Sequence, residues 1–149
     1  MIKFLRFVWQ LPQNLLALFL IGISRSRIKM EFKGNDDKII QVYFVDSVFG
    51  CGVSLGDYVL LDRERYLELT SVFHSTFIDT INHEHGHQIQ SLYFGPLYLP
   101  VIGISSSVFN NLWDRLFHRN WLYSRRYRWY YSRFPEKWAD KLGKVERNI

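Results

Sequence analysis

Apolar residues dominate the first 29 positions, and the few polar residues among them are regularly spaced. The polar side chains recur every three or four positions, at Lys3, Arg6, Gln10, Gln13 and Asn14. This period places them in one stripe along a helix and leaves a broad apolar face. Pro12 should kink or restart the helix. We therefore predict an amphipathic, hydrophobic N-terminal helical segment over residues 1–29, which either lies at a membrane interface or packs into a core.

The pattern changes over residues 38–61. Here KIIQVYFVDSVFG and CGVSLGDYVLLD combine β-branched and aromatic residues with glycines. Such runs are typical of strands, and Gly56-Asp57 is typical of a tight turn between two of them. We predict two or three strands in a small antiparallel or mixed sheet.

Helical spacing returns over residues 76–94. Thr76-x-x-Asp79 has the form of a capping box, and Gly95-Pro96 should end the helix. The apolar positions of this helix are Phe77, Ile78, Ile81, Ile89 and Leu92. A second, short helix is predicted over residues 135–143, opened by a proline and closed by a glycine.

Between these helices lies a long apolar stretch without charged residues. It covers residues 95–113, and no Asp, Glu, Lys or Arg occurs between His87 and Asp114. Glycines and prolines interrupt it, so we expect a buried or re-entrant apolar hairpin rather than a straight spanning helix.

Length and charge bound the interpretation further. A chain of 149 residues fits one domain, residues 1–149, and its net charge of +5 favours an anionic partner such as lipid or nucleic acid. Cys51 is the single cysteine and cannot form an internal disulfide. The apolar N-terminus lacks an Ala-x-Ala cleavage site, so we expect no cleavable signal peptide. We expect membrane association, with the cytoplasmic side favoured.

Three of the five histidines fall within five consecutive positions of the predicted helix, in TINHEHGHQIQS. Residues i and i+4 share a helix face, so His83 and His87 can reach one cation, and Glu84 can lean toward it. This is H-E-x-x-H, which combines two zinc ligands with a carboxylate that takes a proton from water. His85 projects to another face. Gly86 in mid-helix indicates that another segment passes close to the helix backbone.

Zinc needs a further protein ligand, and the segment EKWAD supplies two carboxylates four residues apart, Glu136 and Asp140. HEHGH together with EKWAD resembles the HExxH…ExxAD pair of gluzincin metallopeptidases, including the integral-membrane CAAX-protease and stress-protease type. The chain also resembles a set of small, uncharacterised bacterial membrane-associated metalloproteases. The blocks that carry this second resemblance are WQLPQNLL, CGVSLGDY, HEHGHQIQS, GPLYLPVIGI and EKWADKLG.

The resemblance implies an α+β, zincin-like fold, in which a small sheet accompanies an H-E-x-x-H helix and a second ligand-bearing helix. It also implies that His83, His87 and Glu136 bind Zn²⁺ and that Glu84 is the general base. Asp140 would accept a hydrogen bond from a ligating histidine and fix its tautomer.

Other interpretations of these residues remain open. The two histidines could be surface positions of an amphipathic helix, and the two carboxylates could balance neighbouring lysines. The basic and aromatic block 119–133 could be a solvated face flanking the core, or it could supply an oxyanion stabiliser. The candidates for that role are His118, Tyr130, Tyr131 and Arg133.

Two functions from different classes follow. The first is zinc-dependent hydrolysis of a peptide or protein substrate. An extended peptide would then pair with the edge of the strand formed by Gly52, Val53, Ser54 and Leu55. The second is a non-enzymatic basic-aromatic module for anionic lipid or nucleic acid, with structural zinc or none. The clustered i,i+4 ligands favour the first, and no specific nucleic acid partner is expected.

Overall fold

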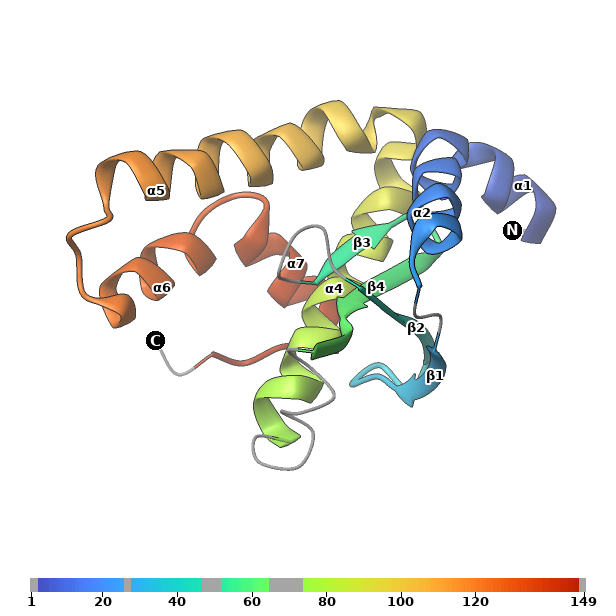
Figure 1. Cartoon of the computed structure of the whole chain (residues 1–149), viewed down its shortest axis with the longest axis horizontal. Coiled ribbons are helices and arrows are strands. Elements are labelled where there is room, and N and C mark those ends of the chain that lie inside the picture. The colour runs from blue at the N-terminus through green and yellow to red at the C-terminus, as the bar shows by residue number, and fades with distance from the viewer. Residues whose placement is uncertain (1–2, 26–27, 47–51, 65–73, 148–149) are drawn as a thin grey trace.

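The structure is a computed structural model of the chain, and it describes residues 3–25, 28–46, 52–64 and 74–147. Cys51 lies outside these residues. The described chain is α+β, as predicted, with helices around a small mixed sheet (Figure 1).

Four strands form the sheet, in the order β1-β2-β4-β3. Their bounds are Ile28–Lys33 for β1, Ile39–Val45 for β2, Val53–Leu55 for β3 and Tyr58–Asp62 for β4. β2 and β4 are parallel, whereas β1–β2 and β3–β4 are antiparallel. The turn predicted at Gly56-Asp57 joins β3 to β4, and Gly56 has a φ of 62° there, which suits a residue without Cβ. β3 is therefore an edge strand of the sheet.

β1 was not predicted, because its side chains give little burial signal. All but one of the six are exposed, and the strand pairs with β2 through its backbone. An edge strand in which Phe32 alone is partly buried lacks the alternation that identifies a strand in a sequence.

Two helices precede the sheet, α1 (Lys3–Trp9) and α2 (Leu11–Ile23), and their axes meet at 91°. Pro12 lies in the first turn of α2, where its missing N–H removes no helical hydrogen bond. The predicted break at Pro12 is present. α2 covers one face of the sheet, where Ala17 packs with Val45, Leu55 and Leu60.

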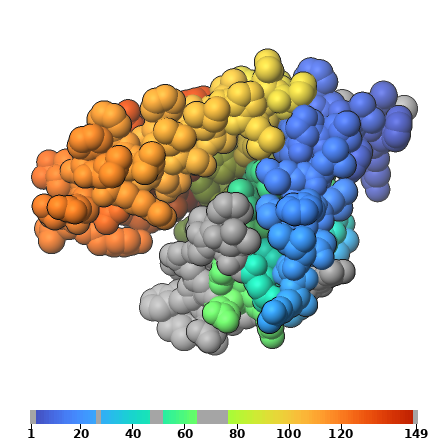
Figure 2. Space-filling view, turned by 45° about the horizontal axis from the view of Figure 1, so that its top comes forward, coloured from blue at the N-terminus to red at the C-terminus, as the bar shows by residue number. Residues whose placement is uncertain are grey.

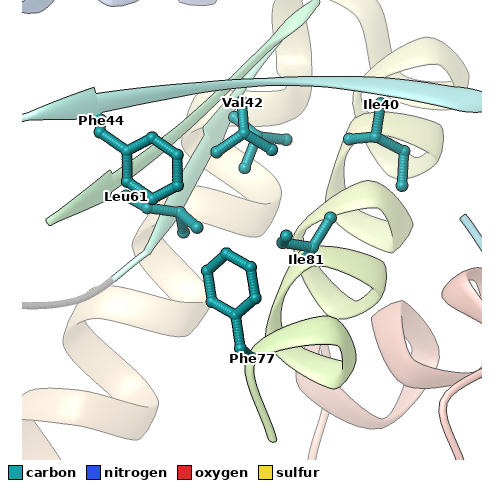
Figure 3. Packing of buried hydrophobic residues seen from close by; sticks show 7 residues of the cluster. Ile40, Val42, Phe44, Leu61, Phe77 and Ile81 are labelled. Carbon is teal, nitrogen blue, oxygen red and sulfur yellow. The ribbon is translucent and has the colours of Figure 1, made fainter. Parts of the chain in front are cut away.

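The opposite face of the sheet packs against α4 (His74–Phe94). The strands contribute alternate positions, and the helix contributes positions four residues apart, as Figure 3 shows. This cluster consists of Ile40, Val42, Phe44, Val59, Leu61, Phe77 and Ile81. Full burial of each such side chain stabilises the fold by about 1.5–3 kcal/mol, which fixes the face that α4 turns away from the sheet.

The apolar segment 95–113 is helical, not a hairpin. After the 3₁₀ turn η1 (Gly95–Leu97) the chain continues through two π-helical stretches, η2 (Leu99–Gly103) and η3 (Ser105–Leu112), into α5 (Trp113–Phe117). The sharp change of direction follows η1: Gly95 has a φ of 51°, and the helical stretches Phe77–Leu97 and Leu99–Phe117 meet at 117°. Pro100 is in the first turn of η2 and so does not interrupt the helix after the bend.

No single helix in the described chain is long and apolar enough to cross a membrane. Two bent pairs of helices meet that test of length and composition when each pair is taken together. One pair is α1 with α2, and the other is Phe77–Leu97 with Leu99–Phe117.

The last two helices are α6 (Tyr123–Tyr131) and α7 (Glu136–Gly143). They return beneath the rod formed by η2, η3 and α5 (Figure 1). α7 packs directly on the backbone of α4. A Cβ on Gly86 would lie 1.9 Å from the carbonyl oxygen of Ala139, and one on Gly143 would lie 1.9 Å from that of Asn82. The close approach predicted at Gly86 is thus the contact with α7. The left-handed residue that ends α7 is Lys144, with a φ of 54°.

Candidate metal centre

The crossing of α4 and α7 brings together three potential metal ligands that are distant in sequence. His83 and His87 lie one turn apart on α4, and Glu136 is the first residue of α7. All three are buried, and one ligand atom from each lies within 4.8 Å of the others. The histidine pair is therefore not a solvent-facing polar stripe, and Glu136 is not a surface charge.

The hydrogen bonds of the two histidines orient both rings toward Glu136. The Nδ1–H of His83 donates to Asp140 Oδ1 at 2.7 Å, because a carboxylate can only accept. The Nδ1–H of His87 donates to Gln90 Oε1 at 2.7 Å, and Gln90 Nε2 in turn donates to the Pro135 carbonyl at 3.0 Å. With Nδ1 protonated, each ring directs the lone pair of Nε2 inward.

Both inward-facing nitrogens meet the same carboxylate oxygen. Glu136 Oε2 lies 3.1 Å from His83 Nε2 and 3.3 Å from His87 Nε2. The two Nε2 atoms and Glu136 Oε2 would all be acceptors, and acceptor atoms this close repel one another unless a proton or a cation lies between them. A zinc ion with tetrahedral bonds of about 2.1 Å would hold its ligand atoms about 3.4 Å apart, and the two distances to Glu136 Oε2 are close to that value.

Two further properties of the cluster indicate a cation. Glu136 Oε1 is buried and has no hydrogen-bond partner within the described part of the chain. Burial alone would lower the pKa of His83, but hydrogen bonds to Asp140 and Glu136 outweigh it and raise the pKa to about 9. Burial would likewise raise the pKa of Glu136, yet the two histidines hold it well below its ordinary value. The carboxylates thus favour positive charge at this point, which either a proton on His83 or a metal ion can supply.

Glu84 follows the first histidine and is buried beside the cluster. Burial raises its pKa above the ordinary value for a glutamate, which suits a group that must accept and then release a proton. Room for its carboxylate comes from Gly52, because a Cβ at that position would lie 2.8 Å from Glu84 Oε1. The segment that leads into β3 therefore runs against the predicted base.

Asp140 is held in turn by a residue that the sequence did not single out. Arg147 donates from Nε to Asp140 Oδ2 at 2.7 Å and from Nη2 to Oδ1 at 2.9 Å. Its guanidinium lies 3.6 Å from the ring centroid of Tyr131 and also hydrogen-bonds to the hydroxyl of Tyr127. Burial would raise the pKa of Asp140, but its hydrogen bonds with His83 and Arg147 lower it. Arg147 thus keeps the Asp140 carboxylate ionised and oriented toward His83.

Of the four oxyanion candidates, Tyr131 contacts the cluster directly. Its ring centroid lies 5.3 Å from that of His83, edge to face. Burial raises its pKa, so the phenol stays protonated at neutral pH. Burial also raises the pKa of Tyr130, whose hydroxyl lies 3.3 Å from the Ser106 hydroxyl.

The other two candidates contact different groups. His118 stacks on Trp121 at 3.8 Å between ring centroids and lies 3.4 Å from Asp114 Oδ1, and the Arg133 guanidinium lies over Trp129. His85 is also apart from the cluster, with Gln88 and Asp36 as its partners. The basic and aromatic block therefore stacks largely on itself.

The predicted peptide-binding edge is partly covered. In the two-residue hairpin that joins β3 to β4, Leu55 pairs with Tyr58 and Val53 with Leu60, so the backbone of Ser54 points away from β4. The Ser54 carbonyl accepts a hydrogen bond of 3.0 Å from the Tyr98 hydroxyl. A peptide aligned on this edge would meet Tyr98 at its centre.

Comparison of the chain with protein-family models, curated proteins and solved structures finds no match. What can be said of function therefore depends on the geometry of the site itself.

Proposed function

We propose that this protein is a zinc-dependent peptidase in which His83, His87 and Glu136 hold the metal. The observation that carries the proposal is the convergence of both Nε2 atoms on one carboxylate oxygen, at 3.1 and 3.3 Å, with a buried glutamate one residue from the first ligand. A site that only stabilised the fold would have no use for that additional buried carboxylate.

Zinc in this ligand set supplies Lewis-acid polarisation of a carbonyl group and lowers the pKa of water toward about 7. Glu84 accepts the proton of the attacking water and passes it to the leaving amine. Tyr131, the neutral phenol beside His83, is the candidate donor to the developing oxyanion. Gly52 lies next to Glu84, but a peptide could pair with the β3 edge only if it displaced the Tyr98 hydroxyl from the Ser54 carbonyl.

The metal assignment is tested by zinc content, with neighbouring histidines as a matched pair. Wild-type protein is expected to bind one zinc per chain, and His87→Gln to lose it. His85→Gln should retain zinc, because His85 is buried on the same helix but bonds to Gln88 and Asp36 instead. Equal zinc content in the two variants would exclude the proposed ligand set.

The catalytic assignment is tested by Glu84→Gln, which keeps the shape of the side chain and removes the base. This variant should retain zinc and lose about 10²–10⁴-fold in the turnover of a fluorescently labelled unfolded protein such as casein. Glu136→Gln is the companion variant and should lose zinc and activity together. Unchanged turnover by Glu84→Gln, with zinc bound, would show that Glu84 is not the base.

A further inference from the structure

The N-terminal helices are inverted relative to helices that pack onto a water-soluble core. Their amide side chains face inward and most of their large apolar side chains face outward, whereas Ala17, Leu20 and Ile21 of α2 pack on the sheet. Gln10, Gln13 and Asn14 are fully buried. The exposed apolar residues of α1 and α2 are Phe4, Leu5, Val8, Trp9, Leu11, Leu15, Leu16, Leu18, Phe19 and Ile23.

The inward polar side chains are fixed by specific partners. Gln13 Nε2 donates to Ser91 Oγ at 2.9 Å and to the Gly95 carbonyl at 2.8 Å. The side-chain oxygen of Asn14 accepts from the Asp57 N–H at 2.9 Å. These bonds prevent α2 from rolling its apolar face into the protein, because a roll would leave buried polar groups on α4 and the β3–β4 turn without partners.

A second apolar surface adjoins the first. Along the segment after α4, the exposed apolar residues are Leu97, Ile104, Val108, Phe109, Leu112, Trp113, Leu116 and Phe117. Trp9 connects the two surfaces. Its indole N–H donates to the Leu92 carbonyl at 2.9 Å, and its ring occupies the space that a Cβ on Gly95 would need. Figure 2 shows the two N-terminal helices (blue) against the segment after α4 (yellow to orange), on one face of the molecule.

The charges around this face fit an anionic surface. Residues 3–23 and 95–113 contain no carboxylate, and the acidic residue that follows, Asp114, is buried and paired with Arg126. Exposed basic side chains lie at the ends of the apolar elements, at Lys3, Arg25, Arg115 and Arg119. Such flanks would repel a second copy of the chain and attract anionic headgroups, at about 1 kcal/mol for each basic residue near the surface.

We propose that this face, formed by α1, α2 and the rod from η2 to α5, inserts into one side of a lipid bilayer. Exposed apolar surface of this extent marks an interaction site in folded proteins. The bends of 91° and 117° fit elements that lie in the plane of the interface, with their apolar sides in the acyl chains and their basic ends at the headgroups. The inference does not depend on the hydrolytic activity proposed above.

The test is flotation of the full-length chain with phosphatidylcholine vesicles, with and without phosphatidylglycerol. The protein should float with both, more strongly with the anionic lipid. It should stay bound at about 1 M salt, where the Debye length is about 3 Å and electrostatic adsorption alone is lost. Absence of flotation, or complete release by salt, would overturn insertion.

Three substitutions with matched exposure locate the contact. Phe19→Glu in α2 and Leu116→Glu in α5 place a charge on the proposed face, where the original side chains are 62% and 61% exposed. Each should lower the partition into vesicles by at least about tenfold. Ile39→Glu, at a position that is 61% exposed on the sheet, should leave partition unchanged.

Circular dichroism confirms that each variant is folded. The two face variants lie on different elements, so a folding defect in one leaves the other informative. Equal partition for all three variants would overturn the proposal. A soluble wild-type dimer that Phe19→Glu converts to monomer would assign the face to a second copy instead.

Discussion

At the scale of single residues, the proposed metal centre depends on a side chain close to the end of the described chain. Replacing Arg147 by Ala removes both hydrogen bonds to Asp140, and Asp140 then no longer holds the His83 ring in one orientation. Partners of this kind typically contribute 10–100-fold to metal affinity. We therefore expect zinc affinity to fall by about that factor, measured by competition with a chelator.

The matched control for this substitution is Arg125→Ala. The Arg125 guanidinium also lies on an aromatic ring, 3.9 Å from the centroid of Trp121, but that ring stacks with His118 rather than with the metal cluster. Its loss should leave zinc affinity unchanged. If Arg147→Ala binds zinc as tightly as wild type, Asp140 orients His83 without help from Arg147.

How much of the site the sequence reveals depends on how local each contact is. Helical periodicity alone places His83 and His87 on one face, and Gln90, three residues after His87, could have been recognised by the same period. Glu136 was found as one of two downstream carboxylates four residues apart, and only the resemblance to a paired motif assigned it as a ligand, since nothing in its local sequence distinguishes it from a surface charge. Arg147 follows the last helix, and no periodicity predicts that the chain there returns to Asp140.

At the scale of secondary-structure elements, the crossing of α4 and α7 depends on glycine. Substituting Gly86 by Ala would place a methyl group 1.9 Å from the backbone carbonyl of Ala139, and a backbone cannot move aside as a flexible side chain can. We expect a loss of at least about 2 kcal/mol in the free energy of unfolding, within the usual range for overpacking. Chemical denaturation measures it.

Gly103→Ala provides the helical control. A Cβ there meets only the end of the Leu99 side chain, at 3.8 Å. This substitution should be neutral or stabilise the protein by up to about 1 kcal/mol, because alanine loses less backbone entropy in a helix. Equal effects of the two substitutions would mean that α4 and α7 separate at little cost.

Helices and strands could be predicted where a buried face produces a regular spacing of apolar residues in the sequence. β2, β4 and α4 contribute alternating or helically spaced side chains to one cluster, and each was expected from its pattern. β1 and the helical course of residues 95–113 were not predicted. β1 buries little, and the apolar segment contains several Pro and Gly residues, although its sharp bend lies at the break between Leu97 and Leu99.

At the scale of the whole molecule, the sequence indicated the polar stripe of the N-terminal helices but not its direction. A stripe of amides could equally face water. Its inward orientation depends on acceptors and donors supplied by Asp57, Ser91 and Gly95, which lie more than 40 residues away in sequence. Only the assembled fold shows that the apolar sides are the ones left exposed.

The proposed metal centre should also make the stability of the whole chain depend on zinc, because its ligands come from two helices about 50 residues apart in sequence. An ion that binds only the folded state stabilises it by RT ln(1 + [L]/Kd), about 4 kcal/mol when free zinc is a thousandfold above Kd. For a chain of 149 residues this corresponds to roughly 8–16 °C in Tm.

Removal of zinc by a chelator, in vesicles or mild detergent, should lower Tm by that amount, and added zinc should restore it. Glu84→Gln should show the same dependence, because Glu84 is not a ligand, whereas Glu136→Gln should show little. A zinc-induced shift of equal size in wild type and Glu136→Gln would mean that the stabilising ion binds elsewhere, and that the cluster between α4 and α7 is not the metal centre.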